Sequence, residues 1–135
     1  MALNASDLNA GDTYTECLVE NLSRTQIVMY AGTSGDYNPL HSDEVFTTQI
    51  AGYPSVFAHG MLTMGMTGRM LTNYVGDGRL TKYGVRFTNQ VWPGDTLNAT
   101  ATVDEVADGI VKLNVETTNQ GGTVVLSGYA EARVD

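Results

Sequence analysis

The chain has 135 residues, of which 42% are hydrophobic, and this suits one domain with a single core. Its net charge of -8 argues against nucleic acid as the main partner, because phosphate backbones are bound by basic surfaces. The N-terminus has neither a basic start nor an apolar run. No apolar stretch approaches the roughly 18 residues that cross a bilayer, so we expect a cytoplasmic protein with no membrane partner. The one cysteine, Cys17, has no internal disulfide partner and is interpreted as a small strand residue.

The chain begins with an expected strand and a short helix. Residues 13 to 20 alternate as a strand does. Ser23 and Gln26 form the capping-box pattern that starts a helix, which we expect from about Arg24 to Thr33. Its apolar stripe would consist of Ile27, Val28 and Ala31.

A loop rich in turn-forming residues follows at 35–39. Residues 42–44 read Ser-Asp-Glu and can cap a second short helix, which would run to about Gln49. Another loop, at 51–58, leads to the next element.

Residues 60–75 have the pattern of a helix buried on most faces, because apolar residues occur almost all round and Arg69 alone is charged. Gly65 and Gly68 lower its helix propensity, which makes sense if a sheet packs very close to the helix. Its apolar residues include Met61, Leu62, Met64, Met66, Met70 and Leu71.

The second half of the chain reads as an antiparallel meander. Alternating apolar and polar residues predict four strands, at 82–87, 96–103, 111–115 and 123–134. The turns between them fall at 93–95, 108–109 and 120–122. The order of elements predicts an α+β fold in which an antiparallel sheet wraps a buried central helix.

The residues that could carry chemistry stand on the first loop. Asp36 and His41 are five positions apart with a tight turn between them, and a carboxylate and an imidazole around one water can activate it and shuttle a proton. In the alternative interpretation, Asp36 only holds its own loop in an Asx-turn, and His41 is a satisfied buried histidine or a helix cap. His59 is the one other histidine and no cysteine stands nearby, so no metal site is expected.

The run Tyr30–His41 closely resembles the signature of MaoC-like hydratases, also called hydratase 2, which ends in Gly-Asp-x-Asn-Pro-aliphatic-His. Residues 57–62 are similar to that family's entry to the central helix, and residues 87–97 to its usual strand-turn-strand. The resemblance covers nearly the whole chain. It is especially close to the small (3R)-hydroxyacyl dehydratase subunits of bacterial fatty-acid and mycolic-acid elongation. It implies a single hot-dog domain over residues 1–135.

The resemblance also implies an activity, namely (R)-specific hydration of trans-2-enoyl-CoA or the reverse dehydration of a (3R)-hydroxyacyl thioester. The family's two catalytic positions fall on Asp36 and His41, and its oxyanion-hole glycine falls on Gly60. Gly60 could equally serve close backbone packing. Asn38 would support the loop, and His59 is interpreted as a structural hydrogen-bonding residue. No metal or redox cofactor is implied, because coenzyme A or an acyl carrier enters as part of the substrate.

Other family roles carry over less directly. Some members have an assisting serine further along the central helix, where this chain reads Thr67-Gly68-Arg69, so that role is not transferred. Met64 is foremost a core residue, but it is also a candidate for the wall of an acyl tunnel. The basic residues clustered after the helix are candidates for contacts to the carrier's phosphate, or else ordinary charges on a solvated strand. They are Arg79, Lys82 and Arg86.

The resemblance implies a dimer, formed with a second copy or with a related hot-dog subunit. Two other functions compete with the hydratase. A hot-dog thioesterase usually carries its catalytic carboxylate on the central helix, and residues 60–75 contain no Asp or Glu. A non-catalytic partner subunit would be favoured by loss of Asp36 or His41, and both are present. The sequence does not predict the length or type of the acyl group.

Overall fold

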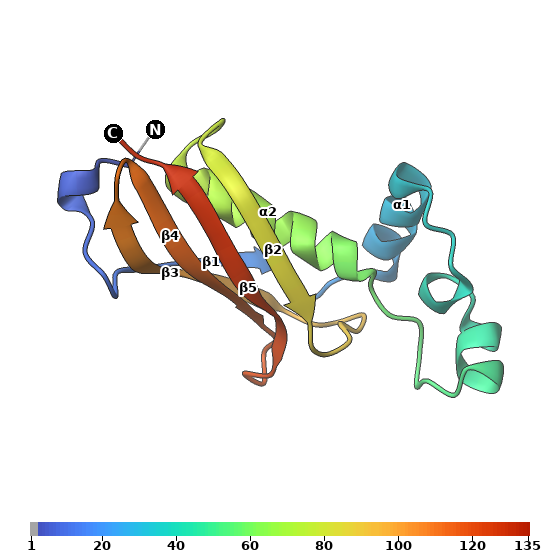
Figure 1. Cartoon of the computed structure of the whole chain (residues 1–135). Helices are drawn as coiled ribbons and strands as arrows, with labels where there is room; N and C mark the ends of the chain where they lie inside the picture. The colour runs from blue at the N-terminus through green and yellow to red at the C-terminus, as the bar shows by residue number, and fades with distance from the viewer. Residues whose placement is uncertain (1–2) are drawn as a thin grey trace.

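The computed structural model describes residues 3–135 and has its elements in the order that the sequence predicts. Helical turns and helices occupy most of the first half, and a meander of strands the second (Figure 1). The elements are η1 (Ala5–Asp7), β1 (Thr13–Val19), α1 (Arg24–Ser34), η2 (Pro39–His41), η3 (Phe46–Ile50), α2 (Gly60–Val75), β2 (Leu80–Phe87), β3 (Leu97–Ala107), β4 (Ile110–Thr118) and β5 (Val124–Arg133).

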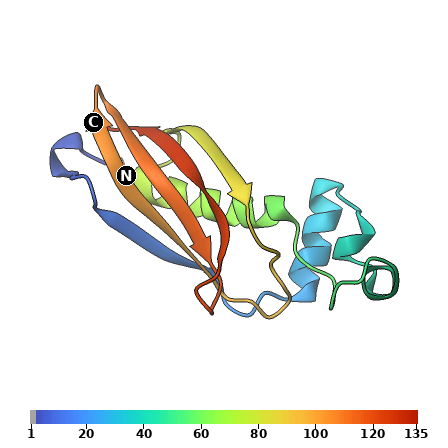
Figure 2. The ribbon, with the colours of Figure 1, turned by 60° about the horizontal axis from the view of Figure 1, so that its bottom comes forward.

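The five strands form one sheet in the order β1-β3-β4-β5-β2, and every neighbouring pair is antiparallel. The helix α2 runs along one face of this sheet, as Figures 1 and 2 show from two directions. A long helix wrapped by an antiparallel sheet is the hot-dog arrangement, so the predicted fold class is confirmed. No helix in residues 3–135 has the length and apolar character that spanning a bilayer requires.

The core lies between the sheet and α2, and the alternation predicted for β3 and β4 creates it. Every second residue is buried over residues 97–103 of β3 and 111–117 of β4, and the polar residues between them are more exposed. The buried apolar set is Leu97, Ala99, Ala101, Val103, Val111, Leu113 and Val115. Between the two strands, Asp108 and Gly109 both have positive φ, as the tightest hairpin turn requires.

The start of α1 forms as predicted, but its buried stripe is narrower. The Gln26 N–H donates to Ser23 Oγ at 3.0 Å, and the Ser23 N–H donates to Gln26 Oε1 at 2.9 Å, which completes the capping box. Ile27 and Ala31 are buried, whereas Val28 is 54% exposed, so its assignment to the apolar stripe was wrong. Because α1 lies beyond the end of the sheet (Figures 1 and 2), only one narrow face of this helix is covered. Consecutive helical residues point about 100° apart, so Val28 points away from the face that contains Ile27.

The second short helix forms over residues 44–50, close to the predicted range, and its last five residues make the π-helical turn η3. Its cap forms as expected, because Asp43 Oδ1 accepts a hydrogen bond from the Phe46 N–H at 3.0 Å.

The central helix buries a different set of residues from the predicted one. Its buried face consists of Thr63, Thr67, Met70, Leu71 and Val75, whereas Met61 is 55% exposed. In its N-terminal half, residues 60–67, Met61 and Gly65 are exposed and the other residues are buried or half-buried, so burial on most faces is confirmed there except at these two positions. That half reaches past the end of β2 toward α1, so one of its sides is not covered by the sheet (Figures 1 and 2).

The two glycines of α2 have different surroundings. A Cβ atom on Gly68 would lie 3.3 Å from the Tyr83 ring of β2, so the expected close approach of the sheet is confirmed there. A Cβ atom on Gly65 would meet nothing within 4 Å, so the same expectation was wrong for Gly65.

We therefore expect Gly65→Ala to raise the free energy of unfolding by about 1 kcal/mol, the difference in helix propensity between glycine and alanine. Gly68→Ala gains the same propensity but presses on the Tyr83 ring, whose hydroxyl donates to the Met64 carbonyl at 2.8 Å. It should be neutral or destabilising. Urea unfolding of both variants measures the difference, and equal changes in the two would contradict the packing described for α2.

Candidate active site

The loop after α1 is held by its own side chains. Gly35 has a φ of 77°, which ends the helix, and Asp36 Oδ1 then accepts a hydrogen bond from the Asn38 N–H at 3.3 Å. Asn38 Oδ1 accepts from the Leu40 N–H at 3.1 Å and so caps η2, the turn that carries His41. Asp36 Oδ2 accepts no hydrogen bond from residues 3–135. The Asx-turn therefore exists and still leaves one carboxylate oxygen of Asp36 available.

His41 is fixed in one tautomer by a backbone carbonyl. Its Nδ1 lies 2.7 Å from the Phe57 carbonyl oxygen. Because a carbonyl oxygen can only accept, Nδ1 carries the proton and Nε2 of the neutral ring keeps its lone pair. The His41 ring is half-buried and thus presents an acceptor that can take a proton from water.

His59, the residue just before α2, touches both members of the pair. Its Nε2 donates to the backbone carbonyl of Asp36 at 3.0 Å, and its ring stacks on His41 with centroids 3.9 Å apart. The His59 side chain is 1% exposed, and Nδ1 is buried without a partner. The structural role expected from the sequence thus includes a direct contact to each candidate catalytic residue.

These contacts bring the three side chains together. One carboxylate oxygen of Asp36 and one ring nitrogen from each of His41 and His59 all lie within 4.8 Å of one another. Two hydrogen bonds of about 2.8 Å can bridge that distance, so one water can bind Asp36 and His41 at once. Side chains of these types could also hold a metal ion, so operation without a metal stays a prediction, which dialysis against a chelator tests.

Burial lowers the pKa of His59 below its ordinary value of 6.5, and the positive charge of a protonated His41 would lower it further. The carbonyl and carboxylate of Asp36 raise it, but desolvation is the larger effect. Below the unfolded-state pKa of 6.5, the unfolded chain therefore binds more protons at this residue than the folded chain does. The free energy of unfolding consequently decreases as the pH is lowered.

We expect the free energy of unfolding to begin to fall as the pH is lowered through about 6.5, the unfolded-state pKa of His59, and to keep falling until the lowered folded-state pKa is passed. In His59→Gln it should fall less. Glutamine keeps an amide near the Nε2 position for the Asp36 carbonyl and does not titrate. Asp36 and His41 are common to both proteins, so the difference between their urea-unfolding curves isolates His59. Parallel pH profiles would contradict the depressed pKa.

Gly60 begins α2 at a helix end that no side chain caps, since His59 makes no capping hydrogen bond. The Leu62 N–H donates to the His59 carbonyl at 3.1 Å, so the available donors at the positive end of the helix dipole are the N–H groups of Gly60 and Met61. A Cβ atom on Gly60 would lie 3.1 Å from three atoms of the Phe87 ring, so close packing also favours glycine here. Gly60 and Phe87 both line a pocket of about 260 Å³, together with Phe57 and Thr63.

The candidate substrate-binding residues lie in different places. Arg79 pairs with Asp135 at 2.8 Å and Lys82 with Glu131 at 3.0 Å, so both are engaged within the chain. Arg86 forms no ion pair within residues 3–135.

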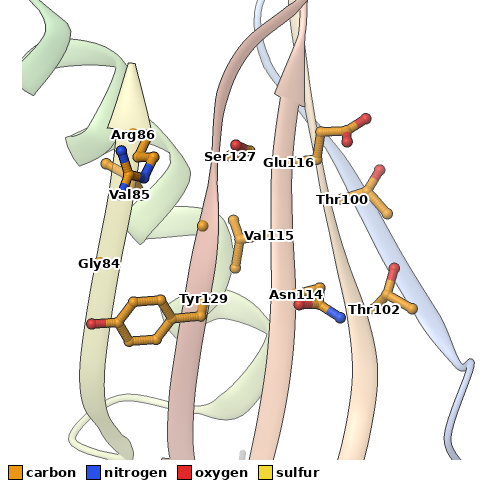
Figure 3. A pocket seen from close by; sticks show the side chains of 11 residues that line it. Gly84, Val85, Arg86, Thr100, Thr102, Asn114, Val115, Glu116, Ser127 and Tyr129 are labelled. Atoms are coloured by element: carbon orange, nitrogen blue, oxygen red, sulfur yellow. The ribbon is translucent and has the colours of Figure 1, made fainter. Parts of the chain in front are cut away.

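Arg86 borders a hollow of about 830 Å³ on the outer face of the sheet, away from α2 (Figure 3). In this hollow Tyr129 lies across Gly84, where a Cβ atom would stand 2.7 Å from the tyrosine oxygen. The hollow is broader than the pocket at Gly60, and neither of the two is lined by Asp36 or His41. Met64 is half-buried on α2 and packs against the core.

Sequence reasoning did not single out Thr63. It is 2% exposed, its Oγ1 has no partner, and it lines the pocket beside Gly60. The available signal was a threonine three positions after that glycine in an otherwise apolar run. Thr67 uses its hydroxyl in the core, in a bond of 2.7 Å to the Thr117 hydroxyl of β4.

A hot-dog domain with a carboxylate and an imidazole beside an uncapped helix start has the groups that acid–base chemistry on an acyl group needs. Comparison with known proteins agrees. Residues 8–125 match the family model described as MaoC like domain, and the chain belongs to this family.

Several named proteins are similar to this chain. It is 39% identical over 90 residues to 3-hydroxyacyl-thioester dehydratase Y of Mycobacterium tuberculosis, which covers 64% of this chain and 31% of that protein. It is 32% identical over 117 residues to peroxisomal enoyl-CoA hydratase 2 of Arabidopsis thaliana, which covers 84% of this chain and 36% of that protein. The chain thus spans about a third of the length of these relatives. The solved R-hydratase PhaJ1 from Pseudomonas aeruginosa superimposes with a TM-score of 0.83 at 26% identity, over 98% of this chain and 86% of the other.

Proposed function

We propose that this chain adds water across the double bond of a trans-2-enoyl thioester to give the (R)-3-hydroxyacyl product, or catalyses the reverse dehydration. The observation that carries the proposal is the meeting of Asp36 and His41 within reach of one water, in a MaoC-like domain. Relatives named as enoyl-CoA hydratase and 3-hydroxyacyl-thioester dehydratase support the reaction class.

In the proposed mechanism, a water held between Asp36 and His41 attacks C3 of the enoyl group. His41 Nε2 accepts the water's proton, for which its tautomer is suited. The electrons of the double bond move toward the thioester carbonyl, whose oxygen becomes an enolate stabilised by the Gly60 N–H. A proton returned from the Asp36–His41 pair to C2 completes the addition, so atoms and charge balance.

The test is hydration of crotonyl-CoA by the purified chain, followed as loss of the enoyl absorbance. A thioesterase would instead release free coenzyme A thiol, and a non-catalytic subunit would do neither. Activity that survives dialysis against a chelator supports a cofactor-independent reaction. A chain that releases thiol and leaves the enoyl group intact would overturn the proposal.

The proposed substrate carrier is coenzyme A or an acyl-carrier protein, and a cytoplasmic setting stays a prediction. Of the three basic candidates, Arg86 is the proposed contact to the carrier's phosphate, because Arg79 and Lys82 already form ion pairs within the chain.

We propose a homodimer, or a heterodimer with a related hot-dog subunit. β2 is an edge strand whose backbone groups can pair with another chain, and Phe87 at its end is 50% exposed. Met29 and Met61 are also exposed apolar side chains, which a partner subunit could cover. Light scattering on the purified chain measures its oligomeric state.

A further inference from the structure

Within residues 3–135, two buried side-chain polar atoms lack a hydrogen-bond partner, and they stand on either side of Gly60. They are Nδ1 of His59 and Oγ1 of Thr63. A buried hydroxyl without a partner costs about 1–3 kcal/mol, so its presence at the start of α2 needs an explanation.

Three other threonines in helical segments of this chain bond their hydroxyls to the backbone of the preceding turn. Thr33, Thr48 and Thr72 donate to carbonyls three or four residues earlier, at 2.9, 2.7 and 3.1 Å. Thr63 has the same opportunity within α2 and does not take it. Its hydroxyl is therefore free to bond something that the chain itself does not supply.

The pocket beside Gly60 is where such a partner would bind. Thr63 lies three positions after Gly60, on the same side of the helix, and both line the 260 Å³ pocket. Rotation about the Cα–Cβ bond exchanges the positions of Oγ1 and the methyl group, and threonine populates two such rotamers in helices. The hydroxyl can thus be presented to a group bound in the pocket.

The pocket has three other polar side chains, and one of them, Gln90, is exposed and makes no hydrogen bond within residues 3–135. The other two are less available. Thr88 Oγ1 and Asn89 Nδ2 both donate to the Val124 carbonyl, at 2.8 and 2.7 Å. Thr63 is therefore the pocket's buried side chain with an uncommitted donor.

We propose that the Thr63 hydroxyl is a second hydrogen-bond donor to the thioester carbonyl oxygen, beside the Gly60 N–H. This inference rests on the proposed function. Because the oxygen gains negative charge as the enolate forms, a donor aimed at it stabilises the transition state more than the bound substrate. Thr63 should therefore contribute to kcat more than to KM.

The test uses Thr63→Val, which keeps the shape of the side chain and removes the hydroxyl. We expect kcat for crotonyl-CoA to fall about 100-fold, with a smaller change in KM. The free energy of unfolding should stay the same or rise, since an unsatisfied buried hydroxyl is lost. Thr63→Ser restores the donor and should recover most of kcat.

Thr67→Val is the matched control, because Thr67 lies one turn further along the same face and its hydroxyl is already bonded to Thr117. We expect it to lower stability and to leave kcat of the folded enzyme near the wild-type value. A Thr63→Val enzyme with wild-type kcat, or one that loses stability and kcat together, would overturn the proposal.

Binding of butyryl-CoA, a saturated thioester that cannot be hydrated, separates this proposal from the proposed function. Calorimetry should show weaker binding to Thr63→Val than to the wild type. If the wild type binds butyryl-CoA but hydrates no enoyl-CoA, the proposed reaction fails while this comparison still decides the Thr63 contact. Equal affinities for the two proteins would exclude the contact.

Discussion

Asp36→Asn and His41→Asn are each expected to lower kcat/KM for crotonyl-CoA hydration by about 100- to 10,000-fold, the range for loss of a general acid or base. Both substitutions conserve the local structure. Asparagine at 36 keeps the oxygen that accepts from the Asn38 N–H, and asparagine at 41 puts an amide donor near the position of Nδ1, within reach of the Phe57 carbonyl. Loss of activity in folded variants would therefore report chemistry rather than loop collapse.

The control for this experiment is Asp43→Asn. Asp43 lies close in sequence to the pair, but its carboxylate caps the helical segment 44–50, and asparagine can cap in the same way. Its activity should remain near that of the wild type. The double variant of Asp36 and His41 should be little worse than either single variant, because the two act on one water. Turnover that survives both single substitutions would mean that the chemistry lies elsewhere.

Gly60→Ala is expected to lower kcat by about 100- to 1,000-fold, the range for an oxyanion-hole contact that is no longer made, because alanine keeps the N–H but its methyl group displaces either the helix start or the thioester. The new methyl group would lie 3.1 Å from the Phe87 ring and would stand beside the N–H proposed to bind the enolate oxygen. Either the helix start moves away from β2 or the thioester is pushed out. Steady-state kinetics together with urea unfolding measure both consequences.

Two further variants separate the effects of Gly60→Ala. Gly65→Ala adds a methyl group to the same helix where nothing lies within 4 Å, and it should leave kcat unchanged. Adding Phe87→Ala to Gly60→Ala removes the collision. If the double variant regains activity, packing explains the loss, and if it does not, the methyl group itself obstructs the thioester. Full activity in Gly60→Ala alone would remove this glycine from the proposed site.

The fold was predictable where the signal is local. The capping box at Ser23 and the alternation that buries one face of β3 depend on residues a few positions apart. The exposure of Val28 and Met61 depends on where the sheet ends, and no short window of sequence contains that information. The ion pairs of Arg79 and Lys82 join residues that the sheet brings together from 56 and 49 positions away.

The candidate site follows the same division. Asp36 and His41 were recognised because they share one loop and a long motif. The contacts of His59 to both of them, and the free hydroxyl of Thr63, arise only when that loop meets the start of α2. Burial and unmet hydrogen bonds are properties of the packed chain, so the partners of His59 and the role of Thr63 could not be assigned from the sequence alone.

The two histidines link the loop to the start of α2 through hydrogen bonds to each other's segment. The loop's His41 takes its carbonyl partner from Phe57, while His59 at the helix takes its carbonyl partner from Asp36. One hydrogen bond is donated by the loop and the other by the helix segment, so each segment supplies the carbonyl that the other segment's histidine needs. Anyone who grafts this site onto another hot-dog scaffold must therefore transplant residues 36–41 and 57–60 as one cassette, since either alone leaves an imidazole without the carbonyl that fixes its proton.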